Sequence, residues 1–193
     1  MEKKVKKWLT GMGLVLVTTA VPALEMNGVQ VPDTAKVGTA ELVLNGAGVR
    51  TRAIFKVYVG ALYLPEKKTV AMEAIAVKGA KRVALHLLRD LSAEQVAGAL
   101  DNMSDNLSDV EREKLSPQIA DLKATMAAVG EAKEKSLITI DFLPGAGTRV
   151  ALNGTQKGKT IAGDDLYPAL LKIWLGDKPV DRDLKSGMLG APK

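Results

Sequence analysis

The sequence predicts an α+β protein rather than an alternating β–α–β fold. Three observations carry this prediction: strand-like segments lie between residues 29 and 88, helical spacing follows over 92–129, and strands return at 137–161 before a helical C-terminal end. A parallel sheet would instead need a helix after each strand. The length of 193 residues suits one domain with a substantial hydrophobic core and is short for two.

The N-terminus has the three parts of a secretory signal peptide. Four lysines near the start form a basic region, residues 8–20 are mostly apolar, and residues 21–23 are small enough for a signal peptidase. We therefore predict a signal peptide over 1–23, a single mature domain over 24–193, a periplasmic location and no stable membrane insertion after cleavage. The alternative is an uncleaved anchor, but the apolar run is shorter than the roughly 20 residues of a spanning helix.

Removal of residues 1–23 changes the charge of the chain. The whole chain holds 27 Lys and Arg against 22 Asp and Glu; the segment contains four lysines and one glutamate, which leaves 23 basic and 21 acidic residues. A mature protein near +2 lacks the basic footprint of a nucleic-acid-binding protein, so we expect no nucleic-acid partner. The absence of cysteine excludes thiol catalysis and thiolate metal sites.

The first strands are short and separated by turns. Residues 29–31 and 39–44 have strand character, and Pro32-Asp33 marks a turn. Asn45-Gly46 is a hairpin signal, which predicts a turn directly after 39–44. Residues 49–64 are rich in β-branched and aromatic side chains, which predicts either two strands or one long bent strand.

Two capping patterns introduce the helical part. Ser92-Ala93-Glu94-Gln95 predicts a helix start, and residues 108–111 repeat the pattern. Pro117 suits the first turn of a second helix that runs to about Val129. The apolar stripes consist of Val96, Ala99, Leu100, Met103 and Leu107, and then of Ile119, Leu122, Met126 and Val129.

Strands at 81–88, 137–143, 149–152 and 157–161 complete the predicted sheet. Asn153-Gly154 is a second hairpin signal and predicts the turn between the last two. Gly60 inside the run 49–64 indicates a bulge or a close approach of another segment, and Pro65 ends that run. The remaining predicted elements are a turn at Pro144-Gly145, a helix over 164–175 capped by Gly176, and a short helix from Pro179 to about Ser186.

Side chains suited to metal binding or nucleophilic catalysis are few. His86 is the only histidine, and we expect it to have a structural role on its strand. Gly46-Ala47-Gly48 lacks the third glycine and the following helix of a dinucleotide-binding fingerprint. Three aspartates between 101 and 109 recur every four residues but suit a solvated helix face. We therefore predict no metal and no cofactor.

One pair of polar side chains stands out in an apolar setting. Arg50 and Tyr58 are eight residues apart, so on one uninterrupted strand both would point to the same face, whereas a bulge or a turn would change that. Such a pair could belong to a binding site. The other interpretation is that Arg50 lies at the surface or at a sheet edge with an ordinary ion pair, and the spacing alone favours this second interpretation.

Several segments, in order, resemble the chalcone-isomerase superfamily, and most of all its exported bacterial branch of unassigned activity. The matching segments are Leu44–Arg50, Val57–Leu64, Arg89–Ser92, Asp101-Asn102 and Ile173–Val180. The resemblance covers about residues 28–190. It implies a long antiparallel sheet covered by a layer of helices, an open-faced β-sandwich, with a ligand cleft between the sheet and the helices.

The resemblance also implies that this chain does not isomerise chalcones. True chalcone isomerases use an arginine, a threonine, and a tyrosine, lysine and asparagine on the first helix. Arg50 and Asn102 match two of these positions, but Tyr58 replaces the threonine, Gln95 the helix tyrosine and Gly98 the lysine. The reaction needs a polarised ketone and a stabilised phenolate, for which glutamine and glycine are poor substitutes.

Plant fatty-acid-binding members of the superfamily hold a carboxylate with an arginine and a tyrosine, which correspond here to Arg50 and Tyr58. The resemblance therefore implies a non-catalytic protein that binds a fatty acid or a similar amphipathic carboxylate through Arg50, Tyr58 and Asn102. Two alternatives stay open: an isomerase- or lyase-type enzyme that acts on a small carboxylate or enone, and a structural or partner-binding protein with a collapsed cleft. The oligomeric state is not predicted.

Overall fold

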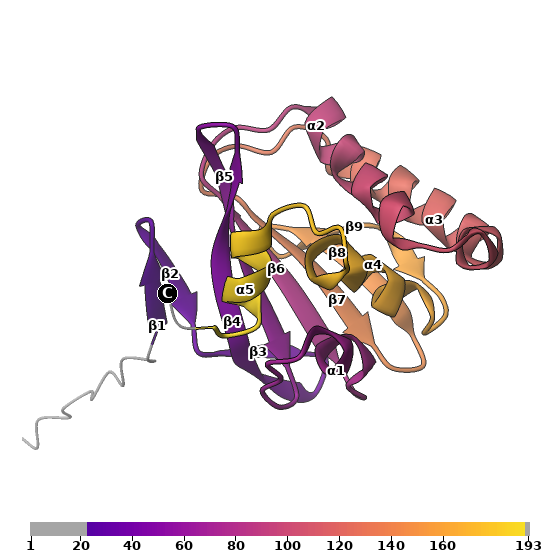
Figure 1. Ribbon diagram of the computed structural model, residues 1–193. Helices are drawn as coiled ribbons and strands as arrows, with labels where there is room; N and C mark the ends of the chain where they lie inside the picture. Colours follow the sequence, from indigo (N-terminus) through magenta and orange to yellow (C-terminus); the bar gives the residue numbers. More distant parts are fainter. Residues whose placement is uncertain (1–22, 192–193) are drawn as a thin grey trace, which may run out of the picture.

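The computed structural model describes residues 23–191, which form two antiparallel sheets with helices on one face of the larger sheet (Figure 1). The predicted signal peptide lies outside the described residues except for Ala23, where β1 begins. The small sheet pairs β1 (Ala23–Met26) with β2 (Val29–Pro32). The large sheet is a meander whose neighbours follow chain order: β3 (Thr34–Val37), β4 (Ala40–Arg52), β5 (Phe55–Leu64), β6 (Lys81–Leu87), β7 (Leu137–Leu143), β8 (Gly147–Leu152) and β9 (Thr155–Ile161).

The helices follow the predicted order, which confirms the α+β class and the layer of helices on the sheet. They are α1 (Ala71–Ala76), α2 (Ala93–Ala97), the 3₁₀ helix η1 (Gly98–Asn106), α3 (Asp109–Val129), α4 (Leu166–Leu175) and α5 (Arg182–Met188). Within residues 23–191, no helix combines the length and the apolar character that are needed to cross a membrane.

The large sheet is buried on both faces along its centre. On β5, Tyr58 and Leu62 face the helices, whereas Val59 and Ala61 face the opposite side. Val31 of β2 packs into this second apolar cluster, so the small sheet covers part of the face away from the helices. Because both faces of β5 are covered, its buried run is continuous rather than alternating.

The predicted turn at Asn45-Gly46 is wrong, because β4 continues through it with a bulge between Leu44 and Gly46. The side chain of Asn45 is buried and accepts a hydrogen bond from the Lys68 backbone nitrogen at 2.6 Å. It also donates to the backbone oxygens of Lys68 and Met188 at 2.9 and 2.7 Å. Tertiary partners therefore satisfy this asparagine inside a strand, where the dipeptide alone indicates a turn.

The run 49–64 is a hairpin of β4 and β5, with its turn at Ala53-Ile54. This is the two-strand form of the prediction. Ala53 has a φ of 54°, a left-handed conformation that is uncommon for alanine. The close approach predicted at Gly60 is confirmed, since a Cβ atom there would lie 3.1 Å from Cδ1 of Leu184.

Both predicted capping boxes form, but the helices that they start differ from the prediction. Ser92 begins α2, which becomes the 3₁₀ helix η1 after five residues. Ser108 begins α3 directly, so Pro117 lies inside this helix and not in its first turn. Pro117 is exposed, and water can satisfy the carbonyl group that a proline leaves without a helical partner.

The predicted Asn153-Gly154 turn joins β8 to β9, and both residues have positive φ, as a type I′ turn requires. The last helix starts at Arg182 rather than at Pro179, because the side chain of Asp181 caps it. Three short elements carry no clear signal in the sequence and were not predicted: β1, β3 and α1.

A buried ionic cluster crosses three strands on the face away from the helices. Asp141 of β7 is 2% exposed and lies opposite Arg82 of β6 and Arg149 of β8. Arg82 donates two hydrogen bonds to its carboxylate at 2.6 and 2.8 Å, and Arg149 donates one at 3.1 Å. The hydrogen bond to Asp141 is the main reason why the pKa of Arg82 is raised.

We expect Asp141→Asn to lower the free energy of unfolding by about 3 kcal/mol, because it leaves two partly buried guanidinium groups without their counter-ion. Urea denaturation measures the change. Asp165→Asn is the matched control, since Asp165 pairs with Lys114 in a solvated position and should contribute below about 1 kcal/mol. Equal losses in the two variants would contradict this account of the cluster.

Candidate ligand-binding site

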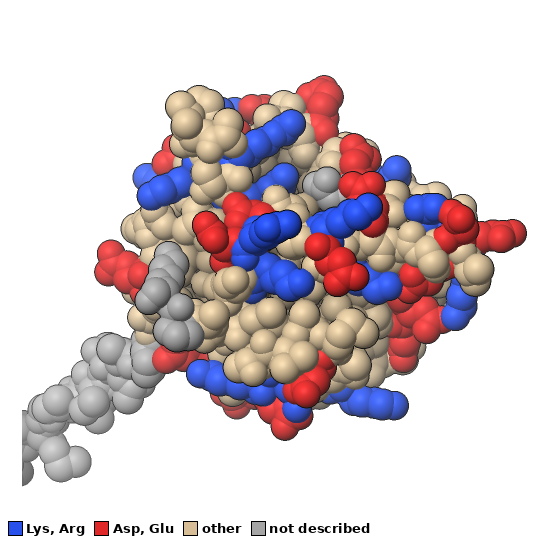
Figure 2. All heavy atoms as spheres, viewed as in Figure 1, with Lys and Arg blue, Asp and Glu red and all other residues tan. Residues whose placement is uncertain are grey.

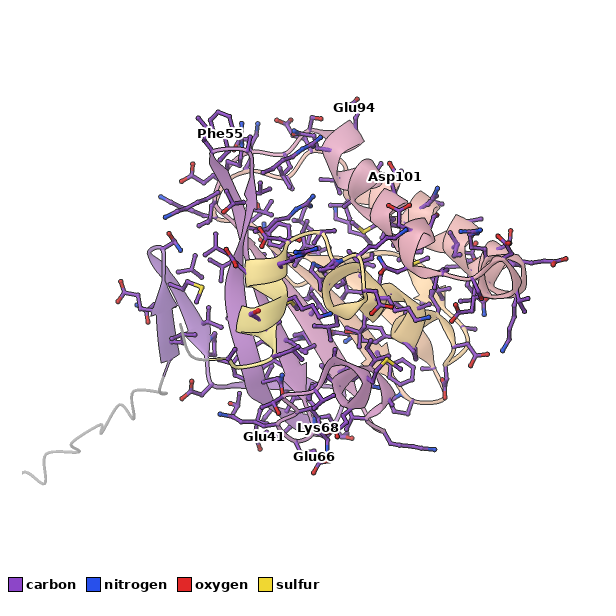
Figure 3. All side chains as sticks on the ribbon, viewed as in Figure 1. Glu41, Phe55, Glu66, Lys68, Glu94 and Asp101 are labelled. Carbon is purple, nitrogen blue, oxygen red and sulfur yellow. The ribbon has the colours of Figure 1, made fainter. Side chains whose placement is uncertain are left out.

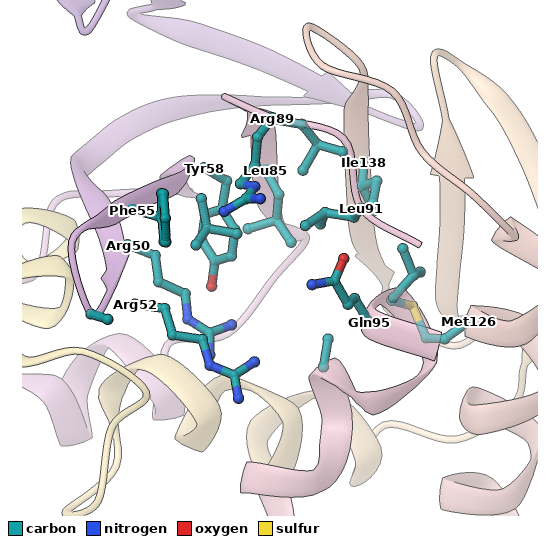
Figure 4. Close-up of a pocket in the computed structure, with 15 residues that line it drawn as sticks. Arg50, Arg52, Phe55, Tyr58, Leu85, Arg89, Leu91, Gln95, Met126 and Ile138 are labelled. Atoms are coloured by element: carbon teal, nitrogen blue, oxygen red, sulfur yellow. The ribbon is translucent and has the colours of Figure 1, made fainter. Parts of the chain in front are cut away.

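A cavity of about 340 Å³ lies between the sheet and the first helices (Figure 4). Strands β4, β5, β6 and β7 form one wall, and α2, η1 and α3 contribute the other. The volume is at the lower end of the range of small-molecule pockets. Most of the lining is apolar: Val57, Leu85, Leu87, Leu91, Val96, Ala99, Met126 and Ile138.

Arg50 and Tyr58 both line this cavity, but not for the reason that their spacing indicates. They lie on two strands, β4 and β5, and are directly opposite each other in the antiparallel register. Opposite residues of an antiparallel pair point to the same face, so the hairpin brings the two side chains together in spite of the turn between them. The guanidinium carbon of Arg50 is 5.7 Å from the centre of the Tyr58 ring.

The Tyr58 hydroxyl is held by a tryptophan for which no local sequence pattern indicates a place in the site. Nε1 of Trp174, on α4, donates a hydrogen bond to Oη of Tyr58 at 3.0 Å. Burial raises the pKa of Tyr58, although Arg50 and Trp174 both act in the opposite direction. The phenol is therefore neutral at physiological pH, and because it already accepts from Trp174, its own proton is available to a ligand.

Arg50 has no acidic partner among the described residues. Its Nε atom is buried without a hydrogen bond, and no carboxylate forms an ion pair with its guanidinium group. Arg82 and Arg149 show the contrast, because both are paired with Asp141. The interpretation of Arg50 as an ordinary surface ion pair is therefore wrong. A partly buried cation without a counter-ion creates a position for an anion.

Further polar residues of the cavity were not predicted as site residues. Arg52 of β4 and Arg89, just after β6, line it, and the Arg89 guanidinium carbon lies 4.9 Å from the centre of the Phe55 ring. Gln95, which matches the helix tyrosine of chalcone isomerases, points across the cavity from α2 (Figure 4). Arg52 lies two residues after Arg50, on the same strand, which is the signal that could have found it.

The two other positions carried over from chalcone isomerases have different outcomes. Gly98 is the first residue of η1 and does not line the cavity. The backbone of residue 102 belongs to η1, but its side chain lies outside the described part of the structure, so a role for Asn102 stays a prediction. Arg52 and Arg89 supply cations from other elements, so the cavity is cationic without the lysine that Gly98 replaces.

His86 takes no part in this cavity. It alternates on β6 with Leu85 and Leu87, which line the cavity, and therefore points to the other face of the sheet. Burial lowers its pKa. Within residues 23–191, no group of three or more histidine, aspartate or glutamate side chains is placed to hold a metal ion.

Comparison with known proteins places the chain in a family. A family model described as chalcone isomerase-like matches residues 23–190. The crystal structure of a fatty-acid binding protein from Arabidopsis thaliana superposes with a TM-score of 0.68 and 15% identity, covering 87% of this chain and 96% of the plant chain. No curated protein sequence matches. Because this family model covers most of the chain, the protein belongs to the chalcone isomerase-like family.

Proposed function

We propose that this protein is a non-catalytic binding protein that holds a fatty acid or a similar amphipathic carboxylate in the cavity beside Arg50. The observation that carries the proposal is the guanidinium group of Arg50, which faces a mostly apolar cavity and has no acidic partner among the described residues. The plant protein of similar fold is a fatty-acid binding protein, which supports the same ligand class.

The chemistry of the lining suits the two ends of such a ligand. A carboxylate can accept a charge-assisted hydrogen bond from Arg50 and another from the neutral hydroxyl of Tyr58. The apolar side chains of the lining can surround an acyl chain, and each buried methylene contributes about 0.8 kcal/mol before the costs of association. The acyl chain should therefore dominate affinity, while Arg50 and Tyr58 select the carboxylate and orient it.

The lining argues against proton-transfer catalysis. Its ionisable side chains are three arginines and Tyr58, and no aspartate, glutamate, lysine or histidine of the described residues is among them. Arginine stays protonated in proteins, and the raised pKa of Tyr58 keeps the phenol neutral, so no general base is available near neutral pH. An enzyme with this lining could only polarise its substrate through the arginines and the neutral phenol.

We further propose that residues 1–23 direct export and that the mature protein acts in the periplasm. Cleavage after Ala23 would remove only the first residue of β1 and leave Leu24–Met26 paired with β2. N-terminal sequencing of the protein recovered from the periplasmic fraction tests this. A first residue of Leu24 supports the proposal, and an intact Met1 in the membrane fraction contradicts it.

Native mass spectrometry of the mature protein, followed by denaturing extraction, tests the ligand. We expect a fatty acid to be released, and we expect the delipidated protein to bind added fatty acid in a calorimetric titration. The recovered compound should be chemically unchanged, because a carrier returns its ligand. A protein that releases no ligand and does not bind added fatty acids would exclude the proposal. Chemical conversion of the compound would favour an enzyme.

Removal of the Tyr58 hydroxyl separates recognition of the carboxylate from burial of the chain. We expect Tyr58→Phe to weaken fatty-acid binding by about tenfold, because it removes one hydrogen bond to a charged group, worth about 1.5 kcal/mol. Binding of the methyl ester of the same fatty acid, measured by the same titration, should change much less. The variant should also be less stable, because the buried Nε1 of Trp174 loses its acceptor. Equal weakening for the acid and the ester would contradict a role for the hydroxyl in carboxylate recognition.

A further inference from the structure

The tip of the β4–β5 hairpin exposes two neighbouring large apolar side chains. Ile54 is 86% exposed and Phe55 is 54% exposed. Single exposed apolar residues are normal on protein surfaces, but these two are adjacent at the end of a hairpin that extends beyond the rest of the sheet (Figure 1). Figure 3 places Phe55 at the opposite end of the molecule from Glu41 and Glu66.

Basic side chains surround this apolar tip. Arg52 and Lys56 flank it in the chain, and the guanidinium group of Arg89 stacks on the Phe55 ring. Among the described residues, none of these three cations forms an ion pair with an acidic group. Lys56 instead donates a hydrogen bond to the side-chain oxygen of Asn27. In the space-filling view, uncharged atoms cover the tip and blue side chains lie beside it (Figure 2).

The same tip borders the opening of the cavity. Arg52, Phe55 and Arg89 line the cavity and are exposed, whereas Tyr58 and Leu85 line it and are buried. The exposed lining residues mark the mouth, so the mouth lies beside the hairpin tip. Whatever surface contacts Ile54 and Phe55 also faces the route by which a ligand enters.

From these observations we infer that the β4–β5 hairpin tip docks on the surface of an anionic lipid bilayer. Ile54 and Phe55 enter the boundary between head groups and acyl chains, and Arg52, Lys56 and Arg89 lie among the negatively charged head groups. Two side chains offer far less area than the roughly 800 Å² per partner of a stable protein interface, which favours a membrane over a protein partner. The inference rests on the proposed function and extends it, because docking would turn the mouth of the cavity toward the membrane that supplies the amphipathic ligand.

Vesicle flotation with the mature protein tests the inference. We expect binding to vesicles of phosphatidylcholine mixed with phosphatidylglycerol, weak binding to phosphatidylcholine alone, and release by salt, because the cations contribute about fivefold each at an anionic surface. Ile54→Ser should reduce binding by about tenfold, because the side chain no longer enters the apolar layer. Val110→Ser is the matched control, since Val110 is 76% exposed on α3 and lies outside the tip; it should bind as the unchanged protein does.

A second pair of variants tests the charges. Lys56→Gln should weaken binding to the anionic vesicles by about fivefold, whereas Lys67→Gln, an exposed lysine beyond the other end of β5, should not. Failure of the unchanged protein to float with anionic vesicles would overturn the inference. Equal vesicle binding by Ile54→Ser and Val110→Ser would also overturn the inference. The exposed tip would then be better explained as a contact surface for another protein.

Failure of docking and failure of the proposed function can be told apart. Ile54 does not line the cavity, so fatty-acid binding by Ile54→Ser in solution, without vesicles, should equal that of the unchanged protein. Loss of flotation with retained fatty-acid binding therefore locates the membrane contact in the tip. If the protein floated with vesicles but bound no fatty acid, the proposed ligand would be wrong and the proposed docking surface would still hold.

Discussion

Replacement of Arg50 by methionine should weaken fatty-acid binding by about ten- to a hundred-fold without abolishing it. The variant loses a charge-assisted hydrogen bond of about 1.5–3 kcal/mol, while the apolar lining that holds the acyl chain stays intact. Isothermal titration of the delipidated protein measures the change. The fatty alcohol of the same length should bind the variant and the unchanged protein about equally, because it carries no charge for Arg50 to recognise.

The same variant should keep or slightly raise the stability of the ligand-free protein. Arg50 has a buried Nε atom without a hydrogen bond and no acidic partner, so its removal relieves an unsatisfied polar group. Loss of the contact with the Tyr58 ring offsets part of this gain. A residue that costs stability and supports binding is characteristic of a functional site.

Arg182→Met is the matched control for this experiment. Arg182 is exposed at the start of α5 and does not line the cavity, so its replacement should leave fatty-acid affinity unchanged. If Arg50→Met bound the fatty acid as tightly as the unchanged protein does, the assignment of the carboxylate site would be wrong.

Replacement of Gly46 by alanine should lower the free energy of unfolding by about 3 kcal/mol, at the upper end of the usual cost of overpacking. A Cβ atom on Gly46 would collide with the backbone oxygen of Gly187 and lie 2.7 Å from the backbone nitrogen of Gly190. Both partners are backbone atoms, so no side chain can rotate away, and α5 has to move. Urea denaturation measures the loss.

The displacement of α5 in Gly46→Ala should also disturb the ligand site. Helix α5 carries Leu184, which packs on Gly48 and Gly60 next to Tyr58. Its capping residue, Asp181, accepts a hydrogen bond from the backbone nitrogen of Thr51 at 2.9 Å, directly after Arg50. We therefore expect Gly46→Ala to weaken fatty-acid binding in the protein that remains folded.

Gly98→Ala is the control for this substitution, because it makes the same chemical change in a helical conformation with room for a methyl group. The nearest atom to a Cβ on Gly98 is a carboxylate oxygen of Asp101 at 3.5 Å, an ordinary contact. This variant should be unchanged or more stable by up to about 1 kcal/mol. If Gly46→Ala were as stable as Gly98→Ala, the close contact between β4 and α5 would not be a determinant of the fold.

Elements with local signals can be predicted from the amino-acid sequence. The α+β order, both capping boxes and the Asn153-Gly154 hairpin follow from neighbouring residues, because turn geometry, capping and periodicity act over a few positions. The importance of Arg50 and Tyr58 came from resemblance to the family, and the structure places both at one cavity.

Features that depend on distant partners become visible only in the folded protein. Asn45 stays inside a strand because Lys68 and Met188 satisfy its side chain, and Trp174 reaches Tyr58 from a helix more than a hundred residues later. Arg89 joins Arg50 at the cavity because β6 lies next to the β4–β5 hairpin. No local pattern encodes such contacts, since chain segments that are far apart in sequence meet only when the sheet and its helices pack together.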